Sequence, residues 1–218
     1  MSSVIIVGAG HIGIACAHYL NRDGYDVTVI DQGLIGDACS RANCGFVAPS
    51  HVMPLTTPQS LRDGIKSLFN SKAAFRVKPQ LRASLYRWLF QFGRRCTQRQ
   101  LHAAGKTLQS ILDVSIDEYR GLLNDSTIDC EWNNDGLLFV FATQKALQEY
   151  AETNEMLARN FDRTARHISG DELAQLEPAL RDDLAGAFLY EDDGFLRPDK
   201  LNASWSEELK GDGVVFIE

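Results

Sequence analysis

The chain has 218 residues, of which 44% are hydrophobic and 23% charged, and its formal net charge is −7. This mixture is typical of a globular protein and excludes collagen-like and disordered sequences. The five cysteines are scattered and odd in number, so they form neither a disulfide framework nor a zinc cluster. No stretch approaches the roughly 18 consecutive apolar residues of a membrane-spanning helix, and the N-terminus lacks the basic region of a secretory signal. We therefore expect a cytoplasmic protein in a reducing compartment.

The first thirty residues predict a βαβ unit. Residues 4–7 and 27–30 are short apolar runs typical of buried parallel strands. Between them, residues 12–22 predict a helix that stops before Gly24. Residues 32–57 are rich in Gly, Ser, Asn and Pro, and a loop of this length usually carries function.

The rest of the chain predicts a mixed middle region followed by a return to α/β structure. Asn133, Asp135 and Gly136 carry a β-hairpin signal, which we expect to join strands at 128–132 and 137–142. Ser169, with Glu172 three residues later, is a capping box that begins a short helix. The other predicted helices cover residues 60–69, 79–95, 98–122, 143–160 and 199–210, and the other predicted strands cover 185–190 and 214–217.

Residues 8–13, Gly-Ala-Gly-His-Ile-Gly, match the G-x-G-x-x-G pattern of dinucleotide-binding proteins, between a predicted strand and a predicted helix. In this pattern the first glycine permits the tight turn, the second leaves room for a pyrophosphate, and the third lets the helix pack closely. Asp31 ends the second strand, where a carboxylate can accept hydrogen bonds from ribose hydroxyls and would repel the 2′-phosphate of NADP. The predicted dinucleotide-binding residues are Gly8, Ala9, Gly10, His11, Ile12, Gly13 and Asp31.

NAD and FAD both fit the bare fingerprint. Ala17 lies four residues after Gly13, where a small residue favours tight packing. Gly24 and residues 27–29 then follow the longer pattern of FAD-binding proteins. An NAD-dependent dehydrogenase stays open as an alternative at this point.

The chain resembles the D-amino-acid dehydrogenase branch of the FAD-dependent D-amino-acid oxidase family. Residues 4–31 are similar to that family's first βαβ unit, and residues 40–45, Ser-Arg-Ala-Asn-Cys-Gly, resemble its second signature. Residues 46–49 fit the stretch that follows it. The positions that follow the family's return from the substrate domain to the FAD sheet are Gly194, Pro198, Leu201, Gly213 and Glu218. The resemblance covers nearly the whole chain and implies an N-terminal portion of such a protein.

The resemblance implies an α/β fold with a Rossmann-like FAD-binding domain and an inserted α+β substrate domain. The first segment of the FAD-binding domain is expected at residues 1–48 and the substrate or cap domain at 49–196. Residues 197–218 are expected to return, incompletely, to the FAD-binding domain. FAD is the implied cofactor, and later segments of the family complete its site and hold the substrate carboxylate.

The second signature adds cofactor-binding candidates. Ser40 can donate a hydrogen bond to a phosphate, while Asn43 and Gly45 can bring the backbone close to a flavin ring. The candidates from this signature are Ser40, Arg41, Asn43, Cys44 and Gly45. Gln32, which follows Asp31, is a further cofactor-binding candidate that could approach the adenine or ribose. The alternative for Arg41 is a solvated surface residue instead of a phosphate contact. The alternative for Cys44 is a residue that only fills space in the packing. His51 is a weak candidate for the substrate cavity, with an ordinary loop histidine as the favoured alternative.

The implied activity is oxidation of a CH–NH2 or CH–NH group in a D- or proline-like amino acid, giving the imino acid in amino acid catabolism. Hydride would pass to the flavin and electrons to an acceptor other than oxygen. The alternatives are a glycine- or sarcosine-type oxidase that uses oxygen, and an FAD-binding fragment without activity. No side chain stands out as a general base. The sequence has no metal-ligand spacing, Ser-His-Asp order or Walker loop.

Residues 62–106 carry eleven Lys and Arg but one acidic residue, whereas the remainder of the chain is acidic. Within them, residues 85–95 mix aromatic and basic side chains, as in interfacial helices at anionic lipid. The alternative is a core helix with a basic outer face. The resemblance implies an electron acceptor at the membrane, so peripheral association with the inner face of the cell membrane is an expectation. No nucleic-acid-binding signature is present.

Overall fold

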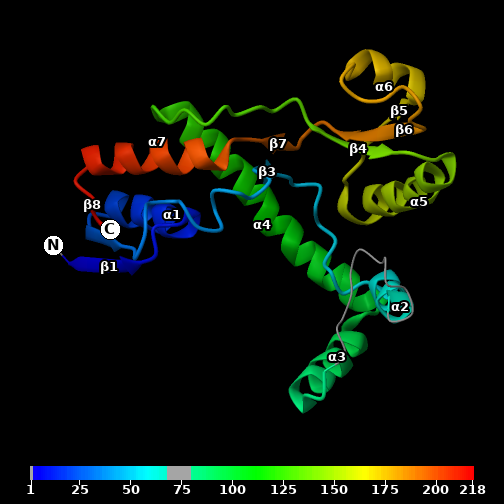
Figure 1. The fold of residues 1–218 in the computed structure, drawn as a ribbon, viewed down its shortest axis with the longest axis horizontal. Helices are drawn as coiled ribbons and strands as arrows, with labels where there is room; N and C mark the ends of the chain where they lie inside the picture. The colour runs from blue at the N-terminus through cyan, green and yellow to red at the C-terminus, as the bar shows by residue number, and fades with distance from the viewer. Residues whose placement is uncertain (1, 68–79) are drawn as a thin grey trace.

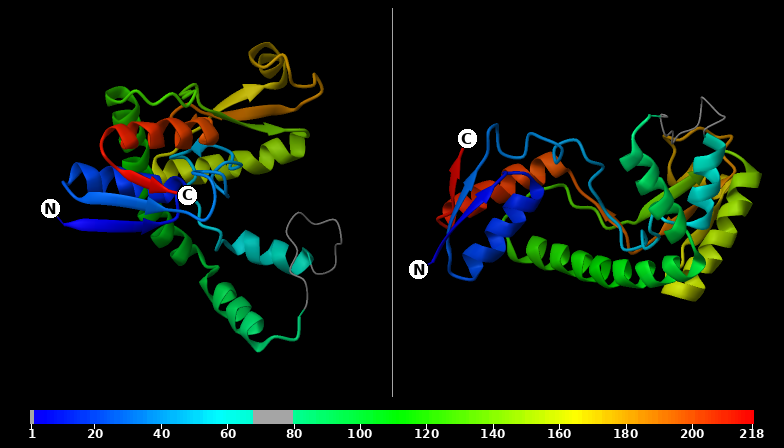
Figure 2. Two further views of the ribbon diagram at one scale, coloured as in Figure 1. Left: turned by 60° about the vertical axis from the view of Figure 1, so that its left-hand side comes forward. Right: turned by 90° about the horizontal axis from the view of Figure 1, so that it is seen from below.

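A computed structural model describes residues 2–67 and 80–218 of the chain (Figure 1). The elements in chain order are β1 (Ser3–Val7), α1 (His11–Arg22), β2 (Asp26–Ile30), β3 (Phe46–Val47), α2 (Pro58–Ser67), α3 (Ala83–Arg95), α4 (Gln98–Asp125), β4 (Leu137–Phe141), α5 (Gln144–Phe161), β5 (Arg166–Ser169), α6 (Gly170–Leu176), β6 (Gly186–Tyr190), β7 (Gly194–Phe195), α7 (Pro198–Gly211) and β8 (Val215–Ile217). Two groups of elements lie at opposite ends of the molecule, and the long helix α4 runs between them (Figures 1 and 2).

The first group is built on a parallel sheet of order β1-β2-β8. Val27 and Val29 of β2 are buried on the face that α1 and α7 cover, in a core that includes Ile14, Leu201 and Trp205. The predicted βαβ unit and the predicted return strand are therefore confirmed, and the α/β fold class with them. The opposite face of this sheet carries apolar side chains that are more than half exposed: Ile5, Val7, Val215 and Ile217.

The second group is built on an antiparallel sheet of order β4-β6-β5. Every residue of the central strand β6 is buried. Phe188 and Tyr190 belong to the core that α5 contributes to, while Ala187 and Leu189 pack with Leu173 of α6. Alternate residues of β6 therefore face two different helices, which accounts for its continuous apolar sequence.

The hairpin predicted between residues 128–132 and 137–142 is wrong. β4 pairs with β6 instead, with Leu137 opposite Tyr190, and residues 128–132 form no strand. Asn133 makes an isolated bridge to Phe195, and its side-chain oxygen accepts a hydrogen bond of 2.7 Å from the Asp135 amide. Residues 133–136 do turn the chain, as their composition indicates. The strand that follows the turn, β4, pairs with β6 and not with residues 128–132.

The predicted helices are present with shifted ends. The helix predicted at 60–69 begins at Pro58, and the one predicted at 79–95 is helical from Ala83; residues 68, 69 and 79 lie outside the described residues. Three short strands, β3, β5 and β7, were not predicted. β3 pairs antiparallel with β7, placing Phe46 opposite Phe195. This pairing joins the two stretches of chain that connect the groups.

Candidate functional site

The glycine-rich turn between β1 and α1 is held by close backbone contacts. Gly8 has a φ of +110° and donates a hydrogen bond of 2.8 Å to the Ile30 carbonyl. A Cβ on Gly13 would lie 1.9 Å from the Gly8 carbonyl oxygen, so only glycine permits this approach of the helix to the turn. The predicted roles of the first and third glycines in turn formation and packing agree with this geometry.

Gly10 differs from Gly13 in what surrounds it. It has an extended backbone at the start of α1, and a Cβ there would meet only the Ser40 hydroxyl, at 3.1 Å. The fold itself therefore tolerates a small side chain at this position. The space in question lies between the first turn of α1 and Ser40, where a phosphate would find backbone amides and the positive end of the helix.

Asp31 anchors the glycine-rich turn to the end of β2. One carboxylate oxygen accepts a hydrogen bond of 2.7 Å from the Ala9 amide, and the other accepts one of 3.0 Å from the Gly33 amide. These backbone donors, the Ala9 amide first, lower the pKa of the Asp31 carboxyl, so it is ionised at neutral pH. Each oxygen keeps a further lone pair, which leaves room to accept ribose hydroxyls.

Residues 40–45 fold back over the start of α1. Ser40 Oγ accepts a hydrogen bond of 3.0 Å from the His11 amide, so its own proton is available to donate. Asn43 shapes the turn, since its Oδ1 accepts from the Gly45 amide at 2.6 Å and its Nδ2 donates to the Ser40 carbonyl at 3.0 Å. Gly45 has a φ of +69°, and a Cβ there would lie 2.0 Å from the Leu196 carbonyl oxygen.

The remaining predicted residues are more loosely placed. The side chains of Ile12, Gln32 and Cys44 are exposed beside the turn, and the Arg41 guanidinium pairs with Asp37. The structure thus brings Gly8, Gly10, Gly13, Asp31 and Ser40 together at one end of the parallel sheet. This donor set fits the diphosphate and ribose of a dinucleotide. Within residues 2–67 and 80–218, no group of three His, Cys, Asp or Glu side chains is arranged to hold a metal ion.

The ring of His11 has a role that the sequence did not indicate. Its Nε2 lies 2.6 Å from the Tyr119 hydroxyl and its Nδ1 lies 3.2 Å from Asn202 Oδ1. These contacts tie the start of α1 to α4 and α7. Burial raises the pKa of Tyr119 to about 12, so the phenol keeps its proton at neutral pH. Asn202 is 1% exposed, and its Nδ2 finds no acceptor among the described residues.

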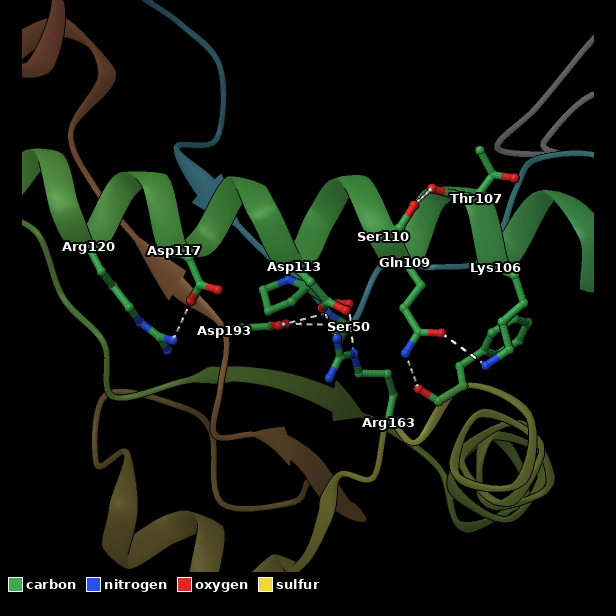
Figure 3. A network of polar contacts seen from close by, with 12 residues as sticks. Ser50, Lys106, Thr107, Gln109, Ser110, Asp113, Asp117, Arg120, Arg163 and Asp193 are labelled. Atoms are coloured by element: carbon green, nitrogen blue, oxygen red, sulfur yellow. Dashed lines mark hydrogen bonds and ion pairs between the residues drawn. The ribbon is translucent and has the colours of Figure 1, made fainter.

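A second polar cluster lies where the chain crosses between the two groups (Figure 3). Asp193 is fully buried and accepts hydrogen bonds from the Ser50 amide at 2.9 Å and the Ser50 hydroxyl at 2.5 Å. Burial raises the pKa of the Asp193 carboxyl, and the two Ser50 donors oppose that rise. Beside it, Arg163 pairs with Asp113 and donates to the Pro49 carbonyl at 3.2 Å. No sequence motif predicts this cluster.

His51 follows Ser50 directly and is exposed. Its ring packs edge-on against Phe139 of β4, with 5.6 Å between the ring centres. His51 therefore lies against the antiparallel sheet. The backbone of the preceding residue, Ser50, is held by its hydrogen bond to Asp193.

The family model "FAD dependent oxidoreductase" matches residues 3–218. The chain belongs to this family. FAD is accordingly its cofactor, and the geometry of the glycine-rich turn with Asp31 is compatible with a dinucleotide. None of the helices in the described part of the chain combines the length and apolar character needed to cross a bilayer.

Curated relatives and solved structures agree with this assignment. The chain is 23% identical to a D-amino acid dehydrogenase of Helicobacter pylori and 28% identical to D-amino acid dehydrogenase 2 of Mesorhizobium japonicum, over 98% of this chain in each case. These matches cover 51% and 52% of the relatives, so the chain spans about half their length.

Among solved structures, the fold is similar to glycine oxidase from Bacillus cereus, with a TM-score of 0.60 and 16% identity over 100% of this chain and 46% of that one. It is also similar to L-amino acid deaminase from Proteus vulgaris, with a TM-score of 0.64 and 19% identity over 100% of this chain and 39% of that one. At these identities the likeness concerns the fold.

Proposed function

We propose that this protein oxidises an amino acid, D- or proline-like, to the imino acid and passes the electrons to an acceptor other than oxygen. The observation that supports this most directly is the similarity to D-amino acid dehydrogenases over 98% of the chain. When bound, FAD supplies the acceptor for the hydride that leaves the substrate α-carbon.

The proposed work of this chain's residues is to bind and orient. Gly8, Gly10 and Gly13 shape the turn that receives the diphosphate, and Asp31 receives the ribose. Ser40, fixed on the His11 amide, would donate its free proton to a phosphate oxygen. Ala9, His11 and Ile12 contribute backbone at the turn. The other proposed contacts come from Gln32, Arg41, Asn43, Cys44 and Gly45.

We further propose that residues 49–196 form the substrate or cap domain and that residues 1–48 and 197–218 belong to the FAD-binding domain. The β3–β7 pairing and the Ser50–Asp193 contact lie where these segments meet. His51, at the same place, is the proposed substrate-side residue of this chain. No general base is assigned, since a buried amine is favoured in its neutral form and needs no base.

A second candidate is a glycine-type oxidase that uses oxygen. It is favoured by the similarity of the fold to glycine oxidase at a TM-score of 0.60. Hydrogen peroxide is the product that separates the two, because a dehydrogenase reduces another acceptor instead.

The test is anaerobic bleaching of the flavin absorbance in the protein as purified from its natural source, with D-alanine, L-alanine, glycine and proline as substrates. We expect D-alanine or proline to bleach the flavin and a dye acceptor to restore it. A matched His51→Gln protein should retain flavin while its KM rises. Bleaching by glycine, with stoichiometric peroxide on admission of air, would favour the oxidase and contradict the proposal.

A further inference from the structure

Helix α3 stands apart from the rest of the molecule. It extends beyond the end of α4, away from both sheets, as Figure 1 and the left view of Figure 2 show. None of its thirteen residues is buried. Tyr86, Trp88 and Phe90 are 51%, 52% and 66% exposed, which is unusual for aromatic side chains grouped on one helix.

The rest of the protein covers only part of the apolar side of α3. Leu85, Leu89 and Phe92, at helical spacing, are partly covered. Tyr86 and Phe90 lie one turn apart on one flank of this strip, and Trp88 lies on the other flank, stacked on Phe92 with 5.2 Å between ring centres. Aromatic side chains therefore border the strip on both flanks and face solvent.

The charges around α3 are all positive, and none of them forms an ion pair with a carboxylate of the described residues. Among the described residues from 80 to 106 there are basic side chains but no acidic ones. The arginines of this stretch are Arg82, Arg87, Arg94, Arg95 and Arg99, and within the described residues none of them lies within ion-pair distance of a carboxylate. Elsewhere seven arginines do form ion pairs: Arg41, Arg120, Arg159, Arg163, Arg166, Arg181 and Arg197.

A shallow hollow lies where α3 ends and α4 begins. It is lined by Gln91, Arg94 and Arg95 of α3 and by Gln100 of α4. Two guanidinium groups and two amides form a donor set suited to a phosphate, since planar guanidinium groups bind its oxygens in pairs. Arg94 also lies over the ring of Phe90, at 5.8 Å, so the basic and aromatic groups form one surface.

We propose that α3 docks on the surface of a bilayer that contains anionic phospholipid. Tyr86, Trp88 and Phe90 would enter the interface between headgroups and acyl chains, where aromatic side chains are favoured. Arg94 and Arg95 would receive a lipid phosphate in the hollow. The rest of the chain is acidic and would be repelled by the same surface, so the charges also fix the orientation, with α3 toward the membrane. Lipid binding is measured without substrate, so this inference stands or falls independently of the proposed oxidation.

The experiment is co-sedimentation of the 218-residue chain with two kinds of vesicle, at low and at high salt. One kind is phosphatidylcholine alone, and the other also contains about 30 mol per cent phosphatidylglycerol. We expect binding to the anionic vesicles, loss of binding at high salt, and little binding to phosphatidylcholine alone. Each lost charge should weaken partitioning about five-fold, so the R94Q/R95Q protein should partition roughly 25-fold more weakly. Trp88→Ser should weaken binding as well.

Matched controls separate docking from a general effect of charge or apolar surface. Arg159→Gln removes an exposed arginine on α5, and Leu176→Ser removes an exposed apolar side chain on α6; both should bind like the wild type. Far-UV circular dichroism checks that each variant folds. If Trp88→Ser does not fold, R94Q/R95Q still tests the proposal, because it alters only exposed side chains. Equal binding to both kinds of vesicle, or unchanged binding by R94Q/R95Q, would overturn the proposal. So would a dimer that Trp88→Ser dissociates, because α3 would then join two copies of the chain.

Discussion

The two three-stranded sheets of this protein differ in what covers them. In the antiparallel sheet, the central strand β6 is buried along its whole length because helices pack against both of its faces. In the parallel sheet, α1 and α7 cover one face, while Ile5 and Val7 on the other face are 68% and 83% exposed. Parallel sheets are usually covered on both faces.

This difference in coverage suggests different roles for the two sheets, one in stability and the other in cofactor binding. The antiparallel sheet buries its own apolar surface, so we expect it to hold the larger share of the folding free energy. The parallel sheet carries the proposed dinucleotide site and leaves apolar surface exposed. Because a ligand that binds only the folded state adds to stability, FAD is expected to stabilise the parallel sheet more than the antiparallel one.

The largest effect is expected at the centre of the antiparallel sheet. Phe188 is 4% exposed, and Phe188→Ala should lower the free energy of unfolding by about 3–5 kcal/mol through lost burial and a residual cavity. Val7→Ala, on the open face of the parallel sheet, should change it by no more than about 0.5 kcal/mol. Urea unfolding of both proteins measures this contrast, and similar costs at the two positions would show that the two sheets do not differ as described.

The next effect concerns the packing of α1 on the glycine-rich turn. Gly13→Ala would place a Cβ 1.9 Å from the Gly8 carbonyl oxygen, and the forced shift should cost about 3 kcal/mol. Gly121→Ala in α4 is the matched control, because nothing lies within 4 Å of its Cβ and alanine favours the helix by about 0.5–1 kcal/mol. Thermal unfolding would contradict this account if the two substitutions had the same sign.

A smaller effect is expected at the buried pair between the groups. Asp193→Ala leaves the Ser50 amide and hydroxyl without a partner and should cost about 1–3 kcal/mol. Asp193→Asn keeps an acceptor of similar shape and should cost less.

The same pair gives a pH dependence with a defined sign. Burial raises the folded-state pKa of Asp193 above its unfolded value, so the folded protein binds this proton more tightly. The resulting stabilisation is fully present below the unfolded pKa and is lost as pH rises through the folded pKa. Urea midpoints between about pH 4 and pH 8 should therefore fall with pH relative to those of Asp193→Asn. Parallel curves for the two proteins would contradict the assignment.

The parts of the fold predicted from sequence are those specified by neighbouring residues. The βαβ unit follows from two apolar runs, a helical period and a glycine pattern, all within thirty residues. The hairpin prediction failed because Asn133 and Asp135 specify a turn but not which strand follows it. β4 instead pairs with β6, about fifty residues later, as burial of Phe188 and Tyr190 requires.

The candidate site divides in the same way. Gly8, Gly10, Gly13 and Asp31 were predicted because the parallel topology brings the ends of β1 and β2 together. The contact of His11 with Tyr119 spans 108 residues, and no local pattern indicates it. Asp193 reaches Ser50 across 143 residues, and the only local signal, a run of three acidic residues before Gly194, is typical of an ordinary turn.

The most direct test of the dinucleotide site is FAD binding by Gly10→Val, followed by quenching of flavin fluorescence. Because a Cβ at Gly10 would meet only the Ser40 hydroxyl, at 3.1 Å, the variant should keep the fold yet bind FAD about 100-fold more weakly or worse, through exclusion of the diphosphate. Gly121→Ala should bind as the wild type does, and Asp31→Ala should bind roughly ten-fold more weakly. Undiminished FAD affinity in a folded Gly10→Val protein would contradict the placement of the cofactor at the start of α1.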